Sequence, residues 1–282
     1  MFTLKIQNTN GDIWELSHNS NYHIKGVQGL TPPPTAVNTA TAGTIDGSFH
    51  NSSRVEQRNI VITLVPNGDI EANRQLLYTM FPRKTKCTIY FKNKYRNVKI
   101  DGYVETLESD IFTMREEVQI SIICPRPFFE DLYFIYKEIS SVVALFEFPF
   151  SIVEPIPFSE LLETPQLKVN NVGDVMCGTK IDVYCYDTVE GLKIINTTTS
   201  EYFELNYTFA NGDHILIDTN SGQMSVKVIR SGVTTNLLNY VTQGSKWFKI
   251  IPGINIFTYT LTTGTDNSLK VFFTTSLMYG GV

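Results

Sequence analysis

The chain has 282 residues, 42% hydrophobic and 12% aromatic, which is enough for one large core or two medium ones. Its 23 basic and 28 acidic side chains give a net charge of −5, without the strongly basic balance of a nucleic-acid-binding protein. The acidic excess lies in the second half: residues 1–135 carry 14 basic and 14 acidic side chains, and residues 136–282 carry 9 and 14.

The N-terminal residues alternate apolar and polar side chains and lack the basic and apolar regions of a secretory signal, so they favour a first strand. The apolar runs are too short and too often broken by proline to span a bilayer. We therefore expect a soluble protein made in a cytoplasm, with no membrane insertion.

Strand signals dominate the chain. Runs rich in β-branched and aromatic residues recur between turn residues, at positions 60–65, 87–91, 98–104, 118–124, 180–186, 214–218, 224–229 and 269–273. Short strands at this spacing predict β-sandwiches or barrels.

The stretch Thr31–Arg58 lacks a sustained periodic pattern. It begins with three prolines and continues through small polar residues. A loop this long inside a compact domain is unusual and often functional. Two alternatives are open: a surface loop, or an arm that becomes ordered by lying on a neighbouring subunit. In the second case Arg54, Glu56 and Arg58 are the candidate inter-subunit residues, because guanidinium groups suit bidentate pairing.

One segment has helical spacing instead, from Asp69 to Met80. Asp69 can serve as the N-cap, and Pro82 lies just beyond the end. We expect a helix of about three turns that packs on a sheet through Leu76, Leu77 and Met80.

Seven basic residues and no acidic one fall between Arg83 and Lys99, with aromatic residues interleaved. This run suits a solvated hairpin face, a nucleic-acid surface, the wall of a lumen, or a protein contact. We favour a protein contact, because Lys92, Lys94 and Arg96 would share one face of an extended chain.

A domain boundary is expected after the two prolines of Cys124–Asp131, near residue 135. The predicted domains are residues 1–135 and 136–282. None of the four cysteines forms a CxxC pair or a zinc-type spacing with histidine. We expect buried reduced thiols, with a disulfide between Cys177 and Cys185 as the weaker alternative.

Several motifs occur in an order that resembles the distal tail protein family of long-tailed phages. In the first half they are Gly43–Phe49, the Arg54–Glu56–Arg58 run before a strand, and Cys124–Asp131. In the second half they are Asn170–Asp174, Phe203–Asn206, Ile251–Ile256 and Tyr279–Val282. Ser200 departs from the pattern, since the family usually has glycine there.

This resemblance implies a mainly β fold. The N-terminal domain would be a tail-tube-like β-sandwich or split barrel with one helix that forms a hexameric ring, and the C-terminal domain a galectin-like β-sandwich. The implied role is structural: a virion protein of the tail tip, assembled in the bacterial host cytoplasm, that connects the tail tube to the baseplate hub or tail fibre. The implied partners are copies of the chain in a homo-hexamer, the tail tube protein, the hub or fibre protein and the tape measure protein, with DNA only in transit.

Reactive residues do not converge on a catalytic site. The four histidines fall in no HExxH, GxSxG or Walker pattern. Asp46, Ser48 and His50 crowd one stretch, but alternating positions in an extended chain do not place a nucleophile and a base around a substrate. Acidic pairs at 105/108 and 116/117 are better explained as surface charges than as a glycosidase pair. We expect no enzyme, cofactor or metal site.

The alternative function is a host-surface carbohydrate-binding module of the tail tip, with Trp247 stacking on a sugar. Against it, a tryptophan followed by alternating apolar residues such as Phe248 and Ile250 more often fills a sandwich core.

Overall fold

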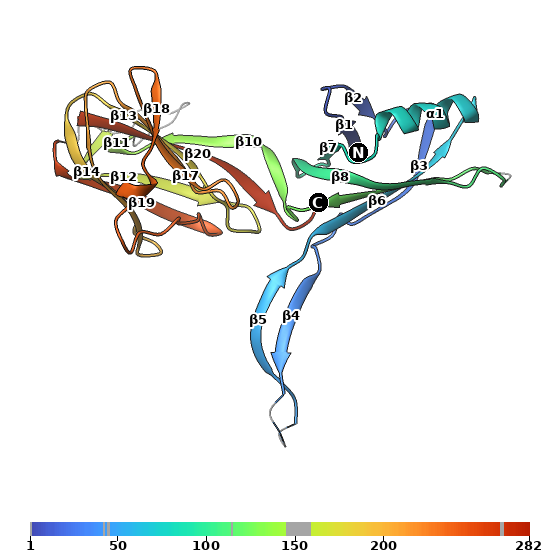
Figure 1. Cartoon of the computed structure of the whole chain (residues 1–282), viewed down its shortest axis with the longest axis horizontal. Helices are drawn as coiled ribbons and strands as arrows, with labels where there is room; N and C mark the ends of the chain where they lie inside the picture. The colour runs from blue at the N-terminus through green and yellow to red at the C-terminus, as the bar shows by residue number, and fades with distance from the viewer. Residues whose placement is uncertain (1, 42, 44–45, 114, 145–158, 266–267) are drawn as a thin grey trace, which may run out of the picture. The chain divides into compact units, whose positions relative to one another are not determined.

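A computed structural model describes residues 2–41, 43, 46–113, 115–144, 159–265 and 268–282 (Figure 1). They fall in two compact units. Unit 1 contains Met1–Leu132 together with Met278–Val282, and unit 2 contains Tyr133–Leu277. The expected domains, 1–135 and 136–282, differ from these units in two respects: the boundary falls after Leu132, and the last five residues cluster with unit 1. Unit 2 is thus an insertion between two parts of unit 1.

Unit 1 is built on an antiparallel sheet whose strand order is β2–β1–β7–β8–β9–β6–β3, with the start of β10 also paired to β8. A separate two-stranded sheet pairs β4 with β5. The strands are β1 (Thr3–Gln7), β2 (Ile13–Glu15), β3 (Tyr22–Gln28), β4 (Thr35–Ala40), β5 (Phe49–Val55), β6 (Arg58–Pro66), β7 (Lys86–Lys92), β8 (Asn97–Ser109), β9 (Val118–Cys124) and β10 (Phe129–Glu138).

The core of unit 1 lies on one face of this sheet, because alternate strand residues point to it. On β6 and β9 these are isoleucine, leucine and valine side chains with little or no exposure, Ile60, Ile62, Leu64, Val118, Ile120 and Ile122. Helix α1 (Ile70–Met80) adds Leu77 and Met80 to the core. Its N-cap is Asp69, whose carboxylate accepts from the backbone N–H of Ala72 at 3.1 Å.

The structure confirms the predicted helix and corrects two details. Leu76 does not pack on the sheet, since its side chain is 39% exposed; the buried face instead carries Asn73 and Arg74. The stretch expected to lack regular structure contains the β4–β5 hairpin, which we call the arm hairpin (Thr35–Val55). The sequence does not predict these two strands, because both faces of the hairpin are exposed and no apolar–polar alternation marks them.

Unit 2 contains two antiparallel sheets. One has the order β18–β17–β16–β13–β20–β10 and the other β11–β12–β19–β14–β15. The elements are β11 (Ser140–Ala144), β12 (Ser159–Asn171), β13 (Lys180–Cys185), β14 (Val189–Asn196), β15 (Glu201–Phe209), β16 (His214–Asp218), β17 (Ser225–Arg230), β18 (Val233–Asn236), a 3-10 turn (Leu238–Tyr240), β19 (Gly253–Thr263) and β20 (Leu269–Tyr279).

Aromatic side chains join the two sheets of unit 2. The rings of Phe257 on β19 and Phe273 on β20 lie 4.8 Å apart, and Phe248 lies 5.4 Å from Phe257. All three are buried. The arrangement is a β-sandwich core, and the mainly β fold class is confirmed.

The four cysteines are buried and free, which confirms the expected thiols and makes the alternative disulfide between Cys177 and Cys185 wrong. Burial raises the pKa of Cys87, Cys124 and Cys185 to about 12, and that of Cys177 to about 11. In the part of the chain that the structure describes, no helix has the length and apolar character needed to cross a membrane.

Candidate assembly interface

The arm hairpin pairs with no third strand among the described residues. Every residue of β5 is exposed, and every residue of β4 except the half-buried Ala36. Figure 1 shows the hairpin extending away from the sheet of unit 1. Because an isolated two-stranded ribbon is marginal in water, the arm needs a further surface to become rigid.

The arm presents both apolar and charged side chains. Val37 and Phe49 are 56% and 57% exposed. The register pairs Val37 with Ser53 and Ala36 with Arg54, which places the two exposed side chains of Val37 and Arg54 on opposite faces. The hairpin therefore offers an apolar group on one face and a guanidinium on the other, and both kinds of side chain are common in protein contacts.

Of the three predicted arm residues, Arg54 and Glu56 are exposed, whereas Arg58 is not. Arg58 is 1% exposed, and its guanidinium lies 4.5 Å from the centre of the Phe129 ring. It donates to the carbonyls of Pro127 (2.7 Å), Thr31 (2.6 Å), Gly29 and Gly280. The expectation that Arg58 contacts a neighbouring subunit is therefore wrong, since these bonds within unit 1 occupy its guanidinium.

The basic residues around the β7–β8 turn do not share one face as expected. Residues 93–96 form a turn in which the Asn93 side chain accepts from the backbone N–H groups of Tyr95 (2.8 Å) and Arg96 (2.7 Å). Lys92 and Lys94 stay exposed. Arg96 is half-buried, lies 4.4 Å from the Tyr279 ring and donates to the Gly281 carbonyl, and its outward contact stays a prediction.

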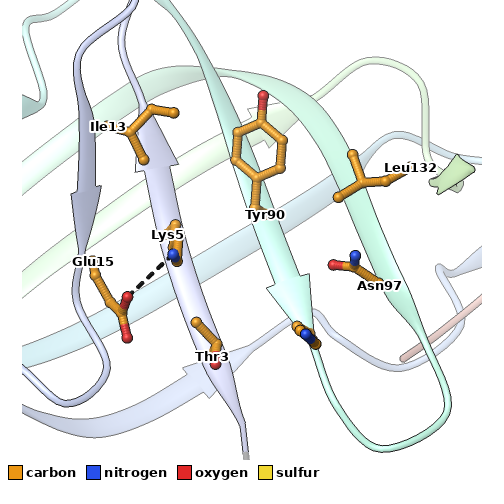
Figure 2. A pocket seen from close by; sticks show the side chains of 8 residues that line it. Thr3, Lys5, Ile13, Glu15, Tyr90, Asn97 and Leu132 are labelled. Atoms are coloured by element: carbon orange, nitrogen blue, oxygen red, sulfur yellow. Dashed lines mark ion pairs between the residues drawn. The ribbon is translucent and has the colours of Figure 1, made fainter.

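Lys92 also lines a groove of about 390 Å³ on the outer face of the β1, β2, β7 and β8 strands (Figure 2). Lys5 and Glu15 form an ion pair of 3.2 Å in its wall. The remaining lining residues are Thr3, Ile13, Tyr90, Asn97 and Leu132. A mixed lining with one ion pair already formed suits a protein side chain better than a small charged ligand.

The structure places the other candidate residues apart. Trp247 is half-buried and lies 4.7 Å from the ring of the buried Phe203. Glu116 pairs with Arg74 at 2.7 Å and Glu117 with Lys25 at 2.6 Å. The described residues hold no cluster of three or more His, Cys, Asp or Glu side chains able to bind a metal ion. Within Asp46–His50, every residue is exposed on the arm hairpin or just before β5.

The comparisons bear on both halves of the chain. Residues 172–276 match the family model described as "Siphovirus-type tail component, C-terminal domain". No curated protein matches the chain. For residues 172–276, the family match agrees with the resemblance to phage tail components that the sequence motifs indicated.

Solved structures share the fold of this chain over nearly its whole length. The crystal structure of the SPP1 Dit protein, described as a paradigm of the hub adsorption apparatus in phages that infect Gram-positive bacteria, has a TM-score of 0.68 and 13% identity, over 98% of this chain and 99% of that one. A chain of the phage P2 baseplate in its activated conformation with Ca has a TM-score of 0.55 and 12% identity, over 100% of both chains. At these identities the likeness shows the fold alone.

Proposed function

We propose that the protein is a distal tail protein that forms a homo-hexameric ring and connects the tail tube to the baseplate hub or tail fibre. The observation that carries this proposal is the match of residues 172–276 to a siphovirus-type tail component, within a fold that is similar to SPP1 Dit from end to end. Its place is then the virion, with assembly in the host cytoplasm, and its role is structural and not enzymatic.

The arm hairpin supports a ring in particular. In a closed ring each subunit uses one surface to contact a different surface of the next, so each copy must present a donor element and an acceptor surface. An exposed two-stranded arm with apolar groups on it, such as Val37 and Phe49, suits the donor element. Arg54 and Glu56 are the charged residues that we assign to this contact.

The exposed Lys92 and Lys94 are our candidates for the contact with the tail tube, because complementary charge fixes register and speeds docking. The tape measure protein is a further partner of the same ring, and DNA passes through it without a dedicated site. The carbohydrate alternative through Trp247 stays a prediction, and the Trp247 ring already lies 4.7 Å from the ring of Phe203.

The proposal is tested by measuring the mass of the purified protein with light scattering and by imaging it in negative stain. We expect six times the mass of one chain and ring-shaped particles with a central opening. A protein that stays monomeric at high concentration, both alone and with tail tube protein, would contradict the ring.

A further inference from the structure

The C-terminal segment Met278–Val282 lies in a site formed by other residues of unit 1. Tyr279 is 8% exposed, its ring covers the guanidinium of Arg96 at 4.4 Å, and its hydroxyl donates to Asp131 at 2.9 Å. Gly280 and Gly281 are buried, and the N–H of Val282 donates to the carbonyl of Leu30 at 3.0 Å. Each of the last four residues is therefore held by a named partner or by burial.

Two arginines bind consecutive backbone carbonyls of this segment. Arg58 donates to the Gly280 carbonyl and Arg96 to the Gly281 carbonyl. Both guanidinium groups also lie over an aromatic ring, Phe129 for Arg58 and Tyr279 for Arg96. Consecutive backbone carbonyls bound by separate arginines are a way of reading an extended peptide, and they fix its register in the site.

The same site forms the base of the arm hairpin. Arg58 lies three residues after β5 and also binds the carbonyls of Gly29 and Thr31, just before β4. A Cβ atom on Gly281 would lie 3.1 Å from both the Leu30 carbonyl oxygen and Pro32 Cδ. The C-terminal segment therefore contacts the segment leading into the arm and shares Arg58 with the segment leading out of it.

Removing the C-terminal segment would leave polar groups at the base of the arm without hydrogen-bond partners. Arg58 is a nearly fully buried charge, and a buried guanidinium needs all of its N–H groups satisfied. Without Gly280 it loses one carbonyl, and water would have to enter to replace it. The Leu30 carbonyl would at the same time lose the hydrogen bond from the N–H of Val282. The base of the arm would then have no fixed geometry.

We propose that unit 1 carries a peptide-binding site for the chain's own Tyr279–Val282 segment, and that its occupancy fixes the base of the arm hairpin. The ligand class is an extended peptide with an aromatic residue and, two positions later, a glycine. A Cβ atom at Gly281 would lie 3.1 Å from Leu30 and Pro32, whereas one at Gly280 would meet nothing within 4 Å. A role of the arm in ring assembly rests on the function proposed above. The peptide-binding site and its effect on the arm do not depend on that function.

Hydrogen exchange of the full chain tests the site. Two variants disturb it, Gly281→Val by steric conflict and Arg96→Ala by loss of recognition. We expect exchange of the Val282 amide, of the Glu56 amide at the arm base and of the arm amides to rise by roughly tenfold, while amides of the core strand β9 keep their rates. Tyr186→Ala, which removes a 54% exposed tyrosine from unit 2, is the matched control and should change neither. Unchanged exchange at Val282, Glu56 and the arm in both variants would overturn the proposal.

A second experiment uses a chain ending at Leu277 and the synthetic peptide of residues 278–282, Met-Tyr-Gly-Gly-Val. The peptide should restore protection at the arm base in a saturable way, whereas the same peptide with valine in place of the second glycine should not. Equal restoration by both peptides would overturn the assigned recognition. Light scattering of the wild-type chain is recorded separately, so a missing ring contradicts the proposed function and leaves the exchange result standing.

Discussion

Asp213 and Arg230 form a bidentate ion pair in unit 2. Arg230 donates from Nε to Oδ1 at 2.8 Å and from Nη2 to Oδ2 at 2.6 Å, and Oδ2 also accepts from the backbone N–H of Ala210. The carboxylate is 1% exposed, whereas the Arg230 side chain is 46% exposed. The pair therefore closes the turn between β15 and β16 while one partner stays in contact with solvent.

This pair predicts a dependence of stability on pH. The pKa of Asp213 is lowered, first of all by the hydrogen bonds from Arg230. A carboxylate with a lowered folded-state pKa stabilises the fold fully above its unfolded pKa of about 3.9 and loses this contribution as the pH falls through the lower folded value. Asp213→Asn should therefore flatten the loss of stability at acidic pH. At pH 7 we expect a cost of about 1–2 kcal/mol, because solvent screens the exposed arginine.

Thermal melting of unit 2 between pH 2 and pH 7 measures this effect. Asp187→Asn, which neutralises an exposed carboxylate of the same unit, is the control and should leave the pH profile unchanged. If both variants follow the wild-type curve, the ion pair does not contribute.

The arm hairpin can be removed cleanly, because the N–H of Glu56 donates to the carbonyl of Pro34 at 2.9 Å and brings the two ends together. Replacing Thr35–Val55 by a short Gly-Ser turn should leave unit 1 stable to within about 0.5 kcal/mol, as expected for exposed positions. The same variant should not form rings by light scattering.

Two point substitutions refine the test. Val37→Asp with Phe49→Asp places charge on the exposed apolar groups of the arm and should also abolish rings. Thr9→Asp with Ser20→Asp adds the same charge to exposed positions of unit 1 outside the arm and should have no effect. Rings that persist in the arm variants would show that the contact lies elsewhere.

Reversing the charge of Lys92 and Lys94 to Glu should preserve isolated rings and block their joining to the tail tube. Arg96 is left in place, because it holds the C-terminal segment. Co-sedimentation with purified tubes measures the joining. Lys180→Glu with Lys227→Glu makes the same charge change on unit 2 and should still co-sediment. Normal joining by the Lys92 and Lys94 variant would favour a solvated face.

Trp247→Ala should destabilise unit 2 by about 1–3 kcal/mol, since the half-buried indole packs on Phe203. Trp247→Phe should recover most of this loss by keeping a ring against Phe203. Retention on immobilised glycans distinguishes the carbohydrate alternative: saturable binding by the wild type that disappears in both variants would support it, and a purely thermal effect would assign Trp247 to the core.

Sequence reasoning succeeded where the signal is local. The cap at Asp69 and the apolar spacing up to Met80 define α1, and the β-branched runs define the strands. It failed at Leu76, because helical spacing alone cannot tell which of two adjacent leucines turns toward the sheet.

The roles of Arg58 and Arg96 could not be predicted, because their partners are backbone carbonyls far away in the sequence. Gly280 is 222 positions from Arg58, and Gly281 is 185 positions from Arg96. Every residue has a backbone carbonyl, so the sequence does not indicate which carbonyl an arginine binds. Each of these arginines therefore looked like a surface charge. The motif Tyr279–Val282 was visible only as part of a resemblance, and nothing local indicated what it binds.

The insertion of unit 2 between Leu132 and Met278 also sets the order in which the chain can mature during translation. A ribosome adds about 5–20 residues per second, so the 145 residues of Tyr133–Leu277 delay the arrival of Gly280 by roughly 7–30 s after Leu132 has been made. Throughout that interval Arg58 is without one of its carbonyls, and the nascent arm has an unfinished base. The inter-subunit contact proposed for the arm is therefore disfavoured between nascent chains until Gly280 and Gly281 have been made.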